Sequence, residues 1–191
     1  MWLDALDAYC EPLRAKANYN TGSISRTSCL LLRGMTEFYR PRVIVEIGTF
    51  IGKSTLSMNA SGHIYTCDKD NDCLPSSERI TCFPKTKSTT MLAELVKRRI
   101  VADFFFFDGR IQADDIAMIL ALSHSATVYA FDDFYADPRK QKGIVNVERL
   151  HHVLPQHRLI EPLPGRDTTI AVLCPESGPV YPGNYLESMP C

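Results

Sequence analysis

The sequence lacks an excess of charge of either sign. Its 191 residues include 21 Lys and Arg against 22 Asp and Glu, for a formal net charge of −1 at pH 7. Proteins that bind nucleic acids depend on a basic surface, so this balance argues against a nucleic-acid partner. Long apolar runs are also absent, since stretches such as residues 116–122 are far shorter than the roughly 20 residues that span a bilayer. We therefore expect neither a nucleic acid nor a membrane as partner.

The seven cysteines lack the spacings of common metal and redox motifs. None forms a C-x-x-C pair, and none has a histidine at zinc-finger spacing. We interpret them as mostly buried side chains in a reducing compartment and expect a cytoplasmic protein. The N-terminal residues carry acids and lack a basic segment followed by an apolar one, which is not typical of a secretory signal. Length and composition predict one domain over residues 1–191.

What the sequence does contain is an alternation of short apolar runs with amphipathic segments. Residues 1–40 predict N-terminal helices, because apolar positions recur at helical spacing. Beyond them, β-branched and aromatic runs alternate with helical patterns, which predicts an α/β core over residues 43–174. The expected strands are residues 43–47, 63–67, 80–83, 102–107, 127–131, 157–161 and 168–174, and the helices between them include residues 55–59, 89–99, 114–123 and 145–153.

This alternation is typical of a Rossmann-like fold, an open, mostly parallel sheet with helices on both faces. The last two expected strands are separated by too few residues for a crossover helix, so we expect a hairpin and a late antiparallel strand. Residues 175–191 contain four prolines and are expected to form an irregular tail.

Polar residues follow four of the expected strands at the point where each strand ends. A glycine turn at residues 48–52 follows the first strand, and Asp68, Asp108 and the pair Asp132 and Asp133 follow three others. The carboxyl ends of parallel strands meet at one edge of a sheet, where open α/β sheets bind ligands. Each acid alone could instead cap the next helix. Four such positions on one edge favour a shared binding site.

The glycine turn matches neither of the common phosphate-binding motifs. Only Gly48 and Gly52 are present, so the dinucleotide fingerprint G-x-G-x-x-G is incomplete. Gly52, Lys53 and Ser54 look like the end of a P-loop, but the spacing to the preceding glycine is one residue short. An NAD-dependent enzyme and a phosphate-binding protein are therefore the weaker alternatives.

The stretch VIVEIGTFIGKS, residues 43–54, resembles the first motif of the class I S-adenosylmethionine (SAM)-dependent methyltransferases. It combines an apolar strand, a glutamate and a Gly-x-x-x-Gly-x-Ser turn. Within this class, the chain is most similar to the small O-methyltransferases of the catechol, caffeoyl-CoA and macrocin type. The resemblance covers about residues 22–174, and the first motif is its most specific part. It implies the same Rossmann-like fold and SAM as the cofactor.

The resemblance also implies roles for residues around SAM. Gly48 and Gly52 would let the backbone approach the methionine moiety, and Glu46 would orient the turn and hold the amino group. Asp68 would accept hydrogen bonds from both ribose hydroxyls, and Ser88 would contact adenine. The implied cofactor-binding set is Glu46, Gly48, Thr49, Phe50, Gly52, Ser54, Asp68, Ser88, Asp108 and Gly109.

Asp108, Asp132 and Asp133 lie where metal-dependent members of this family carry their metal ligands. An all-oxygen ligand set suits Mg²⁺ or Ca²⁺ and does not suit zinc. Such an ion would bind an acceptor hydroxyl, lower its pKa and hold the oxyanion in line with the methyl sulfonium. The alternative is that one of these acids caps the following helix and that no metal binds.

The chain departs from the family pattern after Asp108 and Gly109. A His or Lys commonly follows there, whereas this sequence has Arg110. Asp108 and Arg110 are therefore the candidate catalytic residues, with Arg110 either binding an anionic acceptor or pairing with an acid after the fifth strand. A basic cluster, residues 139–142, borders the same edge and could attract an acidic group of the acceptor.

These observations favour a SAM-dependent methyltransferase that acts on the oxygen of a small hydroxylated molecule, with a divalent cation as an assisting ion. The alternative from a different class is a non-catalytic module that binds SAM or a nucleotide, which the missing His or Lys after Asp108 motivates. The sequence leaves the acceptor and a homo-oligomeric state open, because acceptor pockets are built from variable loops.

Overall fold

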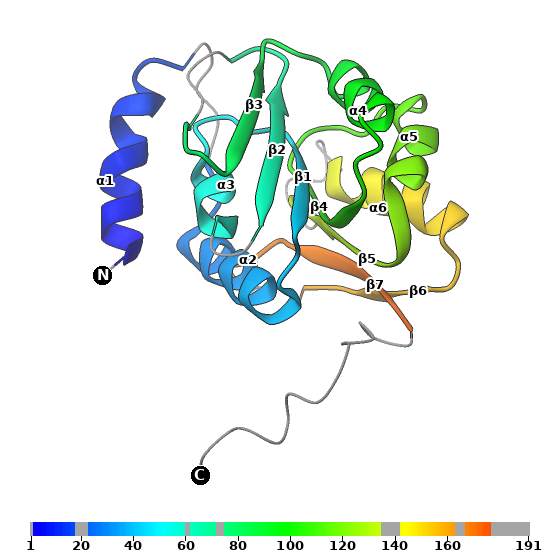
Figure 1. Cartoon of the computed structure of the whole chain (residues 1–191). Coiled ribbons are helices and arrows are strands. Elements are labelled where there is room, and N and C mark those ends of the chain that lie inside the picture. Colours follow the sequence, from blue (N-terminus) through cyan, green and yellow to red (C-terminus); the bar gives the residue numbers. More distant parts are fainter. Residues whose placement is uncertain are drawn as a thin grey trace, which may run out of the picture.

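A seven-stranded sheet runs through the described part of the chain, with the strand order β3-β2-β1-β4-β5-β7-β6 (Figure 1). The computed structural model describes residues 2–17, 23–59, 62–71, 75–134, 142–162 and 167–176. The strands are β1 (Val43–Ile47), β2 (His63–Asp68), β3 (Ile80–Pro84), β4 (Ala102–Phe107), β5 (Ser123–Phe131), β6 (His157–Ile160) and β7 (Ala171–Pro175). The helices are α1 (Trp2–Arg14), α2 (Arg26–Tyr39), α3 (Lys53–Met58), α4 (Ser88–Lys97), α5 (Asp115–Leu122) and α6 (Lys142–Val153).

The sheet has the mostly parallel arrangement that the alternation predicts. The pairs formed among β1 to β5 are parallel, whereas β7 runs antiparallel to both β5 and β6. The predicted hairpin with a late antiparallel strand is therefore confirmed. β4 lies in the middle of the sheet, where it pairs with β1 on one side and with β5 on the other.

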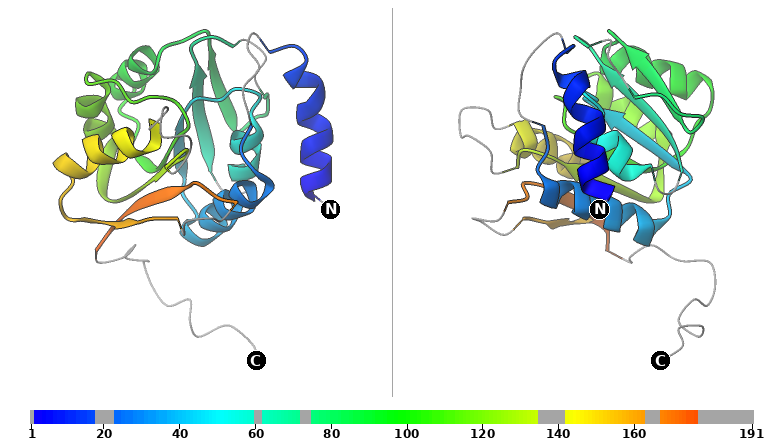
Figure 2. Two further views of the ribbon diagram at one scale, coloured as in Figure 1. Left: turned by 180° about the vertical axis from the view of Figure 1, so that it is seen from behind. Right: turned by 90° about the vertical axis from the view of Figure 1, so that its left-hand side faces the viewer.

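Helices cover both faces of the sheet, as predicted, because successive side chains of a strand point to opposite sides. Phe104 and Phe106 of β4 pack into an apolar cluster with residues of α1, α2 and α3. Phe105 and Phe107 pack into a second cluster with residues of α4, α5 and α6. Figure 2 shows these two helical layers on opposite sides of the sheet. All four phenylalanines are fully buried, and each burial stabilises the fold by roughly 2–3 kcal/mol.

Two element boundaries differ from the predicted ones. β5 begins at Ser123, directly after α5, and not at residue 127. The Thr127 hydroxyl accepts from His124 N–H and donates to the Ala102 carbonyl, which holds this irregular start of β5 against β4. α6 begins at Lys142 and not at residue 145, so that this lysine belongs to the helix.

Three sequence predictions fall partly outside the described residues. The expected polar break is described only from Ser23 onward, the basic cluster at residues 139–142 only at Lys142, and the expected irregular tail only as far as Glu176. None of the helices in the described ranges combines the length and the apolar character that crossing a membrane requires.

Candidate functional site

A cavity of about 900 Å³ lies at the carboxyl ends of β1, β2, β4 and β5. The order of the strands along the sheet reverses between β1 and β4, and open α/β sheets bind their ligands at such a point. The structure brings most of the predicted site residues to this cavity, namely Gly48, Phe50, Asp68, Ser88, Asp108, Gly109, Arg110, Asp132 and Asp133. The other predicted residues, Glu46, Thr49, Gly52 and Ser54, are buried in the segment from β1 to α3.

The turn after β1 depends on a close backbone contact. Gly48 has a φ of +99°, and a Cβ there would lie 2.5 Å from the backbone nitrogen of Gly109. Glycine alone fits both this left-handed conformation and this contact. The N–H groups of Gly48 and Thr49 donate to the carbonyl of Cys67, which holds the turn against β2. The turn therefore joins the ends of β1, β2 and β4 at one point.

Glu46 is a fully buried carboxylate behind this turn. Its Oε1 accepts from the Ser54 hydroxyl at 2.5 Å, and its Oε2 accepts from Thr55 at 2.5 Å and from Thr66 at 2.6 Å. Burial raises the pKa of Glu46 to about 7, although the three hydroxyl donors oppose the shift. Glu46 thus ties the first turn of α3 to β2 and orients the glycine turn, while its contact with a cofactor amino group stays a prediction.

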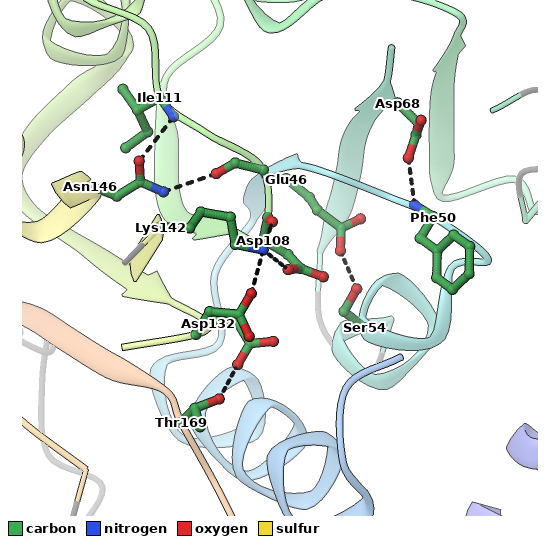
Figure 3. Close-up of polar contacts among 12 residues, drawn as sticks. Glu46, Phe50, Ser54, Asp68, Asp108, Ile111, Asp132, Lys142, Asn146 and Thr169 are labelled. Carbon is green, nitrogen blue, oxygen red and sulfur yellow. Dashed lines mark hydrogen bonds and ion pairs between the residues drawn. The ribbon is translucent and has the colours of Figure 1, made fainter. Parts of the chain in front are cut away.

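Asp68 ends β2 and accepts hydrogen bonds from three backbone N–H groups. Its Oδ2 accepts from Phe50 at 2.8 Å, and its Oδ1 accepts from Asp70 and Asn71 at 2.9 Å each. The Asn71 side chain donates in turn to the Phe50 carbonyl at 2.6 Å. Figure 3 shows Asp68 meeting the backbone of Phe50 across the gap between the two loops. Asp68 therefore holds the loop after β1 and the loop after β2 together at the cavity wall.

Ser88 lines the cavity as the first residue of α4. Its hydroxyl donates to Oδ2 of Asp115 at 2.7 Å, and the same oxygen accepts from the backbone N–H of Gln112 at 2.8 Å. The hydroxyl proton of Ser88 is therefore already engaged within the protein, and its contact with adenine stays a prediction. Asp115, a residue that sequence reasoning did not single out, links α4 to the loop after β4.

Asp108, Asp132 and Asp133 meet at the β4–β5 side of the cavity, next to the ammonium group of Lys142 (Figure 3). The Nζ atom of Lys142 lies 2.6 Å from Oδ1 of Asp108 and 2.7 Å from Oδ2 of Asp133, and it also donates to the Asp108 carbonyl. Oδ1 of Asp132 accepts from the Thr169 hydroxyl at 2.6 Å. A lysine and a threonine from distant parts of the chain thus complete the carboxylate cluster.

Burial and neighbouring charges together set the protonation of this cluster. Burial raises the pKa of Asp108 to about 6, while Lys142 opposes the shift. Burial also raises the pKa of Asp132, against the hydrogen bond from Thr169. For Lys142, burial disfavours the charged form, but Asp108 and Asp133 outweigh it and raise the lysine pKa. Lys142 is therefore an ammonium ion at neutral pH.

The arrangement of these acids does not fit a divalent cation. Among the residues that the structure describes, no group of three or more His, Cys, Asp and Glu side chains is placed to hold a metal ion. Lys142 binds one oxygen each of Asp108 and Asp133, and Thr169 binds an oxygen of Asp132. The predicted Mg²⁺ or Ca²⁺ site thus has no support from the positions of its three proposed ligands.

Arg110 is exposed and lines the cavity. The ion pairs recorded between described residues do not include it, and Lys142 is the cation that pairs with Asp133 after β5. The predicted pairing of Arg110 with these acids is therefore not observed. Its other predicted role, contact with an anionic acceptor, stays a prediction.

Asn146 on α6 is a further residue that sequence reasoning missed. Its Oδ1 accepts from the backbone N–H of Ile111 at 3.0 Å, and its Nδ2 donates to the Gly109 carbonyl at 2.9 Å. One buried side chain thus holds the loop that carries Asp108 and Arg110 (Figure 3). The sequence offered no local signal for Asn146, and the only signal for Lys142 was its place in the basic cluster at residues 139–142.

Solved structures that share this fold include several methyltransferases. The chain superposes on an O-methyltransferase from Bacillus cereus in complex with SAH, S-adenosylhomocysteine, with a TM-score of 0.65 and 17% identity over 90% of each chain. For TomG from Streptomyces achromogenes, an O-methyltransferase of tomaymycin synthesis in complex with SAM, the TM-score is 0.61 and the identity 16%, over 90% of this chain and 89% of that one.

A methyltransferase from Geobacter sulfurreducens gives a TM-score of 0.65 at 14% identity, over 90% of this chain and 88% of that one. No family model matches the chain, and no curated protein sequence matches it significantly. At these identities the likeness concerns the fold. The chain has the Rossmann-like fold of the class I SAM-dependent methyltransferases, as its first motif predicts.

Proposed function

We propose that this chain is a SAM-dependent methyltransferase that transfers a methyl group to the oxygen of a small hydroxylated acceptor. The observation that carries the proposal is the joining of the Gly48 turn, Asp68 and three acidic residues at one cavity. The same fold occurs in O-methyltransferases solved with SAM and with SAH. The cavity volume of about 900 Å³ supports a site for a cofactor and a small molecule together.

The residues at the β1–β2 side fit the cofactor. The backbone around Gly48 carries no side chain that would block a ligand, and Asp68 brings a fixed carboxylate to the cavity wall. We assign Gly48, Phe50 and Gly109 to the methionine moiety, Asp68 to the ribose hydroxyls, and Ser88 to the adenine side. When bound, SAM supplies an electrophilic methyl group on a positively charged sulfur.

The residues at the β4–β5 side fit an acceptor. Asp132 is the acid of the cluster to which Lys142 makes no hydrogen bond, and it lines the cavity. We assign to its carboxylate the proton that the acceptor hydroxyl loses as the new carbon–oxygen bond forms and the carbon–sulfur bond breaks. Arg110, exposed at the same cavity, would orient an acceptor that carries an anionic group.

A divalent cation is not part of this proposal, because Asp108, Asp132 and Asp133 are not arranged as a ligand set. Every assigned step uses residues of the chain itself. The assignment of a methyltransferase is independent of the metal, since the cofactor side of the cavity does not involve the three acids after β4 and β5.

The test is calorimetric titration of the protein with SAM and SAH, followed by an acceptor screen with small hydroxylated molecules. We expect micromolar binding and expect Asp68→Ala to weaken it by about 10- to 100-fold, or roughly 1–3 kcal/mol, because the ribose hydroxyls and the loop after β1 lose their acceptor. Glu94→Ala, which removes an exposed carboxylate of α4, serves as the control and should bind like the unchanged protein.

Two results would contradict the proposal. Absence of SAM and SAH binding, together with binding of NAD, would favour a dinucleotide enzyme. Tight SAM binding without turnover of any acceptor would favour the non-catalytic module that the missing His or Lys after Asp108 suggests.

A further inference from the structure

We propose that Lys142 is the resident cation of the carboxylate cluster, and that it takes the position that a divalent metal would occupy between Asp108 and Asp133. The site therefore binds no Mg²⁺ or Ca²⁺, and the chain catalyses its reaction without a metal. The second half of this statement rests on the proposed function, whereas the first half concerns only the cluster.

The bonding of the Lys142 ammonium group is complete within the protein. An ammonium has three N–H donors and no acceptor. Its three partners here are the Asp108 carboxylate at 2.6 Å, the Asp133 carboxylate at 2.7 Å and the Asp108 carbonyl. The side chain of Lys142 is only 18% exposed, and those of Asp108 and Asp133 are 24% and 31% exposed. The lysine thus belongs to the cavity wall and not to the solvated surface.

Charge balance explains why the cluster needs this cation. Asp108, Asp132 and Asp133 place three acidic groups at neighbouring strand ends, and such groups repel one another when they are removed from water. The charge of Lys142 offsets this repulsion at two of the three acids. A metal ion would need the same oxygens of Asp108 and Asp133, and it could bind them only after the ammonium had left.

The position of Lys142 is fixed by the helix that carries it. Asn146 and Arg149, both on α6, bind the backbone of the loop after β4 through Gly109 and Ile111. Gly143, directly after Lys142, packs so closely that a Cβ there would lie 2.4 Å from the Asp132 carbonyl. The start of α6 is therefore held against the ends of both β4 and β5, and this holds the ammonium at the acids.

The test uses Mn²⁺ as the probe, because its electron paramagnetic resonance signal reports free ion and needs no enzyme activity. We expect the unchanged protein to bind Mn²⁺ more weakly than about 1 mM, the weak end of protein sites for hard cations. Lys142→Ala should bind one Mn²⁺ at least tenfold more tightly, because two carboxylates lose their counter-charge. Adding Asp133→Asn to Lys142→Ala should remove this binding. Lys97→Ala, an exposed lysine at the end of α4, is the matched control and should behave like the unchanged protein.

Two outcomes would overturn the proposal. One is stoichiometric Mn²⁺ binding by the unchanged protein that Asp133→Asn abolishes, since the metal and the lysine would then not exclude each other. The other is that Lys142→Ala gains no affinity for Mn²⁺. If Lys142→Ala fails to fold, as judged by its melting curve, Lys142→Gln is used instead, because its amide keeps a donor for one carboxylate without the charge.

SAH titration of the same samples separates this inference from the proposed function. If the unchanged protein binds neither SAH nor Mn²⁺ while Lys142→Ala binds Mn²⁺, the proposed function is wrong and the resident cation is supported. If SAH binds and methyl transfer is found, we expect the rate to be unchanged by EDTA. A loss of activity in EDTA that Mg²⁺ restores would overturn the metal-free reaction.

Discussion

The two sides of the cavity hold their acidic residues in different ways. On the β1–β2 side, Glu46 accepts from three hydroxyl groups and Asp68 accepts from three backbone N–H groups. On the β4–β5 side, Asp108 and Asp133 share the ammonium group of Lys142. The first side is thus organised by hydrogen bonds from uncharged donors, and the second by an ion pair.

This difference teaches what each side contributes. Hydroxyl and N–H donors fix the geometry of a buried carboxylate but do not cancel its charge, and the pKa of Glu46 consequently rises to about 7. An ammonium group cancels charge as well, but it must come from far along the chain. The first side is therefore a rigid frame for a ligand, and the second is an electrostatic device whose properties depend on one lysine.

The change with the largest expected effect breaks the point where the two sides touch. Gly48→Ala would place a Cβ 2.5 Å from the Gly109 nitrogen at a φ of +99°, so we expect a loss of about 4 kcal/mol in the free energy of unfolding. Denaturant unfolding measures this loss. Gly34→Ala, in the middle of α2 with no atom within 4 Å of the new Cβ, should instead gain about 0.5–1 kcal/mol. A Gly48 variant of unchanged stability would contradict the close contact.

A somewhat smaller effect concerns pH and sharpens the contrast on the β1–β2 side. The folded protein holds a proton on Glu46 up to about pH 7, whereas the unfolded chain loses it near the ordinary pKa of 4.5. The contribution of Glu46 to stability is therefore complete below pH 4.5 and is lost as the pH rises through 7, by on the order of 3 kcal/mol. Glu46→Gln should flatten the unfolding free energy between pH 5 and 8 relative to the unchanged protein. Parallel pH profiles of the two proteins would refute this view.

The smallest of the three effects tests the β4–β5 side. Asn146→Ala leaves the Ile111 N–H and the Gly109 carbonyl without their side-chain partner, which should destabilise the protein by about 2 kcal/mol. His152→Ala, an exposed position on the same helix, is the control and should change stability by less than about 0.5 kcal/mol. Equal melting temperatures for the two variants would show that Asn146 does not hold the loop.

The same contrast explains how much of the site could be predicted. The β1–β2 side is local, because Glu46 and its partners lie 8 to 20 residues apart and follow one strand–turn–helix–strand pattern. The glycine turn, Asp68 and the strand order around them could therefore be inferred from the residues. On the other side, Lys142 lies 34 residues from Asp108, and Thr169 lies 37 residues from Asp132. Apolar periodicity places strands and helices but does not tell which side chain of a later helix reaches an earlier strand end.

Element boundaries were predicted least well where side chains override the apolar pattern. The early start of β5 depends on the Thr127 hydroxyl, and neither Ser123 nor His124 is a residue that favours a strand. The hydroxyl of Ser88 binds Asp115, a contact between two helices that only the packed fold creates. Such polar contacts between elements are the part of a site that a single sequence leaves open.

The antiparallel strand β7 has a consequence for the folding of the chain. It pairs with β5 and brings Thr169 to Asp132, so the acceptor side is complete only after a strand that comes late in the sequence has joined the sheet. Until then, the buried residues of β5 stand at an open sheet edge whose unpaired backbone groups can recruit other chains. We therefore expect folding intermediates that lack β7 to be prone to aggregation through β5, even while the cofactor side is already formed.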